Sequence, residues 1–125
     1  MAWTYLISEI RSGDTATNTF GQLQFSGNYV TGGDSGTLQN GGNTIALPQF
    51  LETSALHASR PPVEYNIQLD AGWLAVVIPG ARAIDFKIKI VNPTTQAELA
   101  AGAYPAALAA ANGNHTMALA YRKNL

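Results

Sequence analysis

A regular alternation of apolar and charged residues marks the clearest secondary-structure element of the chain. From Ile84 to Ile90 every even position is apolar and every odd position is charged. Successive side chains of a strand point to opposite faces, so this pattern predicts a strand with one buried and one exposed face. The turn dipeptides Pro79-Gly80 and Asn92-Pro93 delimit it on either side.

Two further strands are predicted immediately upstream. From Val63 to Leu69 the odd positions are apolar and the even positions are polar. The turn Asp70–Gly72 then leads into the run Trp73 to Ile78, which is apolar at every position and is expected in the interior of a sheet. Residues 63 to 91 are therefore predicted to form three consecutive antiparallel strands.

The N-terminal half carries weaker patterns that also indicate strands. Residues Trp3 to Arg11 are predicted to form a strand, and residues 1–12 as a whole an N-terminal arm or edge strand. Between Phe20 and Tyr29, Leu23, Phe25 and Tyr29 share one side, opposite Phe20 and glutamines.

Glycine-rich turns follow at Thr31–Asp34 and Asn40–Asn43. A hairpin is expected between residues 37–39 and 44–47. Pro48 suits the first position of a short helix that would extend to about Leu56, because proline has no amide hydrogen to leave unpaired there.

The C-terminal part is predicted to contain a short helix and a final strand. Tyr104-Pro105 cannot lie within a helix, so a helix is expected from Pro105 to Ala111. From His115 to Arg122 alternation returns. Seven or eight short antiparallel strands with one or two short helices predict an all-β fold, a jelly-roll-like sandwich or small barrel forming a single domain over residues 1–125.

Composition narrows the function more than the fold. Only 12% of the 125 residues are charged, against about 25% in an average soluble domain, while Ser, Thr, Asn and Gln total 32. The hydrophobic content of 46% argues against disorder. A net charge of −1 argues against binding driven by nucleic-acid phosphates, and the absence of cysteine excludes disulfides and thiolate-ligated metals.

The N-terminus shows no basic start followed by an apolar run, so no signal peptide is predicted. The longest uncharged apolar run, Trp73 to Pro79, is far shorter than the roughly 20 residues that span a bilayer. We therefore expect a soluble protein made in a cytoplasm, with no membrane partner.

Candidate catalytic patterns are few. Gly33–Gly36 resembles the nucleophile loop of chymotrypsin-like proteases, but both His57 and His115 follow Ser35, and a turn is the preferred interpretation. His57 is expected to be an exposed residue at a helix end, and His115 a packed or rim residue at the start of a strand. The acids are scattered, although distant carboxylates can still form a hydrolase pair: Glu9, Asp14, Asp34, Glu52, Glu64, Asp70, Asp85 and Glu98. We expect no enzyme activity, no cofactor and no metal.

Aromatic and basic residues offer candidate contacts instead. Trp3 and Tyr5 at the chain start are a candidate partner anchor, with packing in an edge strand as the alternative. Trp73 is expected in the core, with a sugar-stacking platform as the alternative. Residues 1–81 carry a charge of −4 and residues 82–125 carry +3. The basic residues there form either a solvated strand face or an electropositive patch for a partner.

The segment from Phe25 to Asp34, with Tyr-x-Thr-Gly-Gly at positions 29–33, resembles small virion proteins of tailed bacteriophages of the capsid decoration, or cement, type. Residues 73–78, 84–91 and 98–108 resemble the late strands and the small-residue loop of those proteins, so the resemblance spans about residues 18–122. It implies a jelly-roll-like β domain without catalysis that docks on the major capsid protein as a small oligomer.

The functional hypothesis is a decoration protein, made in the bacterial host cytoplasm, that binds the outer capsid surface as a dimer or trimer and bridges major capsid subunits. The alternative is a carbohydrate- or receptor-binding module of a phage tail or head fibre, using Trp3 or Trp73. The candidate interface residues are Trp3, Tyr5, Tyr29, Asp34, Arg82, Lys87, Lys89 and Arg122.

Overall fold

The computed structural model describes residues 3–12, 16–40, 43–44, 62–80, 85–109 and 115–122. Within these ranges the chain forms ten strands, of which three are only two residues long. The all-β sandwich predicted from the sequence is confirmed. The predicted helix from Pro48 to Leu56 lies outside the described residues, as does Arg82.

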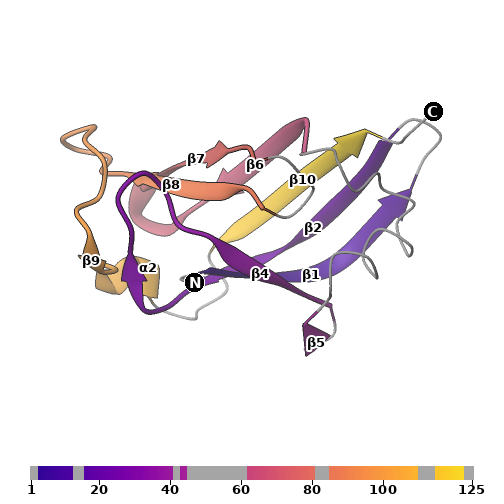
Figure 1. Cartoon of the computed structure of the whole chain (residues 1–125), viewed down its shortest axis with the longest axis horizontal. Coiled ribbons are helices and arrows are strands. Elements are labelled where there is room, and N and C mark those ends of the chain that lie inside the picture. The colour runs from indigo at the N-terminus through magenta and orange to yellow at the C-terminus, as the bar shows by residue number, and fades with distance from the viewer. Residues whose placement is uncertain are drawn as a thin grey trace.

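One layer is a six-stranded sheet, which runs diagonally across Figure 1. Its strands are, in spatial order, β5 (Asn43–Thr44), β4 (Gly36–Asn40), β1 (Trp3–Ser12), β2 (Ala16–Phe25), β10 (Thr116–Arg122) and β6 (Glu64–Gln68). All neighbours pair antiparallel except β1 and β4, which are parallel. The chain leaves β2 on one side of β1 and returns as β4 on its other side, and such a crossover makes the pair parallel.

The other layer consists of two small sheets. One pairs β7 (Leu74–Ile78) with β8 (Lys87–Val91), and the other pairs β3 (Asn28–Tyr29) with β9 (Gly102–Ala103). The short helices η1 (Asp70–Gly72) and α2 (Ala106–Ala109) connect the layers, and α2 confirms the predicted C-terminal helix. The turn at Asp70–Gly72 is also confirmed, with Gly72 at a φ of 75°.

Three sequence-based predictions about strand placement are wrong. Residues 3–12 do not form an edge strand or an arm, because β1 lies between β2 and β4. Residues 63 to 91 do not form three consecutive paired strands, because β6 pairs with β10 and not with β7, although the predicted antiparallel pairing of the second strand with the third is confirmed by β7 and β8. The apolar run of β7 does not lie in a sheet interior, because Leu74, Val76 and Ile78 are exposed. A two-stranded sheet covers the core with one face only, so a strand apolar at every position leaves alternate side chains outside.

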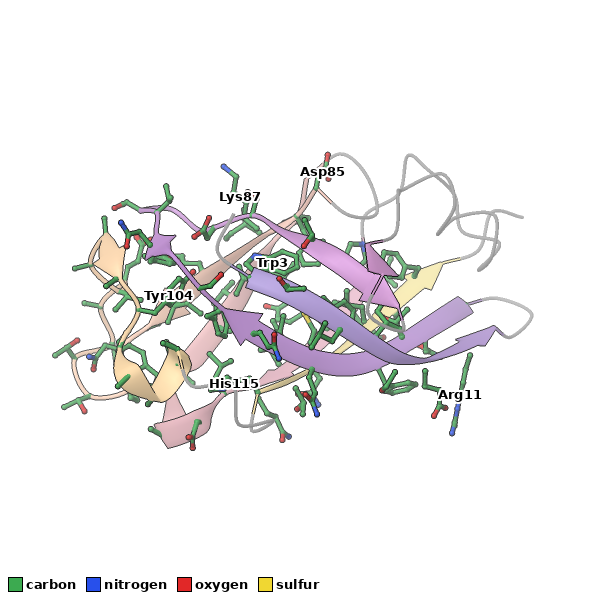
Figure 2. The ribbon with its side chains drawn as sticks, turned by 90° about the horizontal axis from the view of Figure 1, so that it is seen from below. Trp3, Arg11, Asp85, Lys87, Tyr104 and His115 are labelled. Carbon is green, nitrogen blue, oxygen red and sulfur yellow. The ribbon has the colours of Figure 1, made fainter. Side chains whose placement is uncertain are left out.

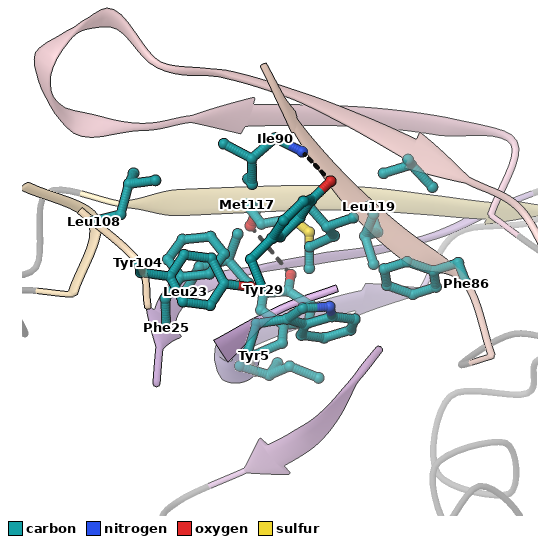
Figure 3. Packing of buried hydrophobic residues seen from close by; sticks show 14 of the residues in the cluster. Tyr5, Leu23, Phe25, Tyr29, Phe86, Ile90, Tyr104, Leu108, Met117 and Leu119 are labelled. Atoms are coloured by element: carbon teal, nitrogen blue, oxygen red, sulfur yellow. Dashed lines mark hydrogen bonds between the residues drawn. The ribbon is translucent and has the colours of Figure 1, made fainter. Parts of the chain in front are cut away.

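The core lies between the two layers, and Figure 3 shows part of it from close by. Its largest members come from β1, β3, β10 and the segment leading into β8: Trp3, Tyr5, Tyr29, Tyr121 and Phe86. The Trp3 and Phe86 rings stack with their centroids 5.2 Å apart. The hydroxyl of Tyr5 lies 2.9 Å from Thr19 Oγ1 and donates to the Met117 carbonyl at 3.1 Å. This buried hydroxyl therefore has hydrogen-bond partners within the core. Burial raises the pKa of Tyr5 to about 12.

Gly36, the first residue of β4, lies directly against Trp3. It pairs with Trp3, and a Cβ added there would meet the Trp3 ring and the Trp3 carbonyl. Trp3 is only 1% exposed and has no room to move aside.

We therefore expect Gly36→Ala to lower the free energy of unfolding by about 3 kcal/mol, the upper range for overpacking a close-packed site. Ser35→Ala, at the exposed preceding position, serves as the control and is expected to change it by less than about 0.5 kcal/mol. Urea denaturation followed by tryptophan fluorescence measures both. Equal stability of the two variants would contradict the packing described for Trp3.

Candidate docking surface

Asp34, at the end of the glycine turn, joins the two layers through its main chain. Its N–H donates to the Ile88 carbonyl at 3.0 Å, and its carbonyl accepts from the Ile88 N–H at 2.9 Å. The same carbonyl accepts from Trp3 Nε1 at 2.7 Å. Both lone pairs of the carbonyl are thus used, and β1 and β8 are held at a fixed distance.

The side chain of Asp34 is also engaged. One carboxylate oxygen accepts from the Ser35 N–H at 3.0 Å, and the other accepts from the Tyr104 hydroxyl at 3.2 Å. Burial, the negative charge of Asp34 and this hydrogen bond all raise the pKa of Tyr104, which keeps its hydroxyl protonated as a donor. We call Trp3, Asp34, Ile88 and Tyr104 the Asp34 cluster.

A second carboxylate holds the same turn from the other side. Glu98 Oε2 accepts from the Tyr29 hydroxyl at 2.7 Å and from the Gly32 N–H at 2.5 Å. The Tyr29 hydroxyl in turn accepts from the Ile90 N–H at 3.2 Å, a contact drawn as a dashed line in Figure 3. Burial, followed by the hydrogen bond to Glu98, raises the pKa of Tyr29 to about 12. The pKa of Glu98 is lowered by the hydrogen bond from the Tyr29 hydroxyl, by the hydrogen bond from the Gly32 N–H and by the positive charge of Lys89.

These contacts change the interpretation of the candidate interface residues. Trp3, Tyr5, Tyr29 and Asp34 are each at most 5% exposed, so they offer no surface to a partner and their prediction as interface contacts is wrong. Their polar atoms form hydrogen bonds inside the fold. Trp3 and Asp34 form theirs within the Asp34 cluster, Tyr5 bonds to the Met117 carbonyl, and Tyr29 bonds to Glu98. A position near the chain start or in a glycine turn does not reveal which residues will pack over it.

Two of the predicted interface residues do lie on the surface. Lys87 is exposed and Lys89 is half-buried, both on β8, and Figure 2 shows Lys87 pointing away from the body of the protein. Arg82 and the side chain of Arg122 lie outside the described residues.

The two lysines belong to a larger surface that the sequence did not reveal. The register of the β7–β8 pair sets Val76 opposite Lys89 and Ile78 opposite Lys87, and paired residues share a face. Leu74 is 52% exposed, and Val76 and Ile78 are 37% exposed. The β7–β8 outer face, as we call it, therefore places an apolar stripe beside a cationic stripe: Leu74, Val76, Ile78, Lys87 and Lys89.

The opposite face of this hairpin is buried. Val77 and Ile88 pair with each other and are 7% and 1% exposed, and Ile90 is fully buried. The six-residue apolar run was the available signal, since a strand that is apolar on both sides must either lie inside a sheet or present one side to a partner.

The two histidines and the acidic residues were the candidates for catalysis or metal binding. His115 is buried, with Nδ1 accepting from the Asp70 N–H at 3.1 Å and Nε2 without a partner. His57 lies outside these ranges. Among the described residues no three His, Asp or Glu side chains gather in an arrangement that could hold a metal ion. No helix in the same ranges is long and apolar enough to cross a membrane.

Comparison of the chain with protein-family models, with curated proteins and with solved structures returned no match.

The Glu98 contacts predict a specific dependence of stability on pH. Because the folded-state pKa of Glu98 is lowered, its ionised form stabilises the fold above the ordinary pKa of a glutamate, and this stabilisation is lost as the pH falls through the lowered value.

We expect Glu98→Gln to destabilise the protein at pH 7, with the difference from the wild type shrinking as the pH falls below about 4.5. Urea unfolding over a pH series measures it. Glu64→Gln, at an exposed position of β6, is the control. A difference that stays constant over the whole series would rule out the ionised Glu98 as the acceptor for Tyr29 and Gly32.

Proposed function

We propose that the protein is a capsid decoration protein of a tailed bacteriophage, which binds the outer surface of the head and bridges neighbouring major capsid subunits. The observation that carries the proposal is the β7–β8 outer face. Contiguous exposed apolar side chains on a rigid strand pair are typical of a surface that is covered in the functional assembly.

The composition of this face fits a permanent but individually modest contact. Burial of Leu74, Val76 and Ile78 supplies the hydrophobic contribution. Lys87 and Lys89 lie beside this stripe and would pair with acidic groups of the partner, which orients the contact. A dimer or trimer of the chain would engage several capsid subunits at once, and such multivalency multiplies a modest affinity.

The support behind this face is stiff. Ile88 is joined to Asp34 by two main-chain hydrogen bonds, and Ile90 is held by the Tyr29 hydroxyl. A surface held in this way loses little conformational freedom on binding. The proposal is of a structural and not an enzymatic role, since both carboxylate oxygens of Asp34 and Oε2 of Glu98 accept hydrogen bonds that hold the fold together.

The site for the alternative module was predicted at Trp3 or Trp73. Trp3 is 1% exposed, and its ring stacks on Phe86, so it offers no platform to a sugar. Trp73 is partly buried against the core. The docking role is therefore the one we propose for this chain.

The test uses virions of the phage that encodes this chain, stripped of it and incubated with purified protein. We expect the wild-type chain to sediment with the capsids. Val76→Asp should lower the affinity at least about tenfold, because burying a carboxylate in an apolar contact costs binding free energy.

Val63→Asp is the matched control, since Val63 is 55% exposed and lies at the start of the opposite layer. It should sediment like the wild type, and circular dichroism checks that both variants fold. Absence of the chain from purified virions, or equal binding of the two variants, would refute the proposal.

A further inference from the structure

The outer face of the six-stranded sheet carries a second surface, which lies on the side of the sandwich away from the β7–β8 outer face. Strand β10 lies between β2 and β6, and its residues on this face are small: Thr116, Ala118 and Ala120. The side chains of Met117, Leu119 and Tyr121 point the other way, into the core.

The strands on either side carry longer residues at the paired positions. Thr116 lies between Gln22 and Gln68, and Ala118 lies between Phe20 and Asn66. Small residues on the middle strand with long residues on both neighbours make a trough along β10. The β10 trough is accordingly hollowed, with an open volume of about 400 Å³ over Thr116 to Ala118 and a smaller one of about 150 Å³ over Ala118 to Ala120. At 3.4 Å per residue its floor from Thr116 to Ala120 is about 14 Å long.

The larger volume has an uncharged lining, whereas the lining of the smaller one includes Glu64, which lies opposite Ala120. The lining of the larger volume combines side-chain amides, hydroxyls and one exposed aromatic ring: Gln22, Asn66, Gln68, Ser8, Thr116 and Phe20. Gly21, Met117 and Ala118 complete it. In the described part of the chain, no intramolecular hydrogen bond engages the side-chain amides of Gln22, Asn66 or Gln68, whereas Ser8 donates to the Phe20 carbonyl at 3.1 Å. Each free amide offers both donors and acceptors to a ligand.

Phe20 supplies the apolar part of the trough. Its ring is 39% exposed, and the Arg11 guanidinium lies 5.9 Å from the ring centroid. Arg11 also forms an ion pair with Glu9, and both residues come from β1, on the side of Phe20 away from β10. The positive charge beside Phe20 is therefore compensated, and the ring borders the trough from the β2 side.

We propose that the β10 trough binds a neutral oligosaccharide. Sugar hydroxyls both donate and accept hydrogen bonds, as the amides do, and the C–H face of a sugar ring packs on an aromatic ring such as Phe20. The larger volume has no charged residue in its lining, and the smaller one has only the carboxylate of Glu64, so neither lining gives a counter-charge to a phosphate or a sulfate. An extended peptide finds no free backbone to pair with, because β10 is hydrogen-bonded on both sides.

The site is independent of the capsid contact, because the two surfaces share no residue and lie on different layers. A decoration protein that exposes the β10 trough would present a glycan-binding site to the surroundings of the particle. A protein with another role would keep the same site.

The test is a glycan microarray that displays neutral, sialylated and sulfated oligosaccharides, probed with the labelled full-length chain over a concentration series. We expect binding to neutral glycans. Gln22→Ala and Asn66→Ala should each weaken it about tenfold, since each removes hydrogen bonds to the ligand.

Gln24→Ala is the matched control, because Gln24 is an exposed residue of the same strand and face but lies outside the trough lining. It should bind like the wild type, as should Val76→Asp. The proposal is overturned by binding to no glycan, by binding to acidic glycans alone, or by Gln22→Ala and Gln24→Ala behaving alike.

Discussion

The structure depends on the way in which Asp34 joins the two layers. Its N–H and carbonyl bond to Ile88 of β8, and the same carbonyl accepts from the indole of Trp3 on β1. This one residue sets the position of β8 over the six-stranded sheet, and with it the stacking of Trp3 on Phe86. Because the Asp34 carboxylate is capped by Ser35 and Tyr104, an acid that is only 5% exposed is kept in the fold with its oxygens satisfied.

The inward use of polar groups leaves two unlike surfaces on opposite layers. The β7–β8 outer face is apolar and cationic, and the β10 trough is rich in amides, with Glu64 at its Ala120 end. The low charge content of the chain now has a structural interpretation. In the described ranges the carboxylates of Asp34 and Glu98 accept hydrogen bonds from the backbone, and uncharged amides line the surface hollow.

Local patterns predicted most of the strands. Alternation correctly indicated β8 and β10, with Ile88, Ile90, Met117 and Leu119 all buried, and the hairpin of β4 and β5 was also predicted. The pairing of β7 with β8 was predicted too, whereas the partners of β1, β6 and β10 were not, because most of these pairings join residues far apart in the sequence. The separation of β6 from β7 reversed the expected role of the β7 run, and the burial of Trp3 and Tyr5 removed the expected anchor. The outward position of Lys87 and Lys89 could be predicted from the sequence, because an alternating strand reveals its outer face.

The central claim is that the two outer faces of the sandwich have separate binding roles. It is tested most directly by cryo-EM of phage heads carrying the protein, at a resolution that traces its strands. We expect density in which the β7–β8 outer face contacts the major capsid protein and the β10 trough faces the solvent. Density in which β10 lies against the capsid and β7 faces the solvent would contradict it.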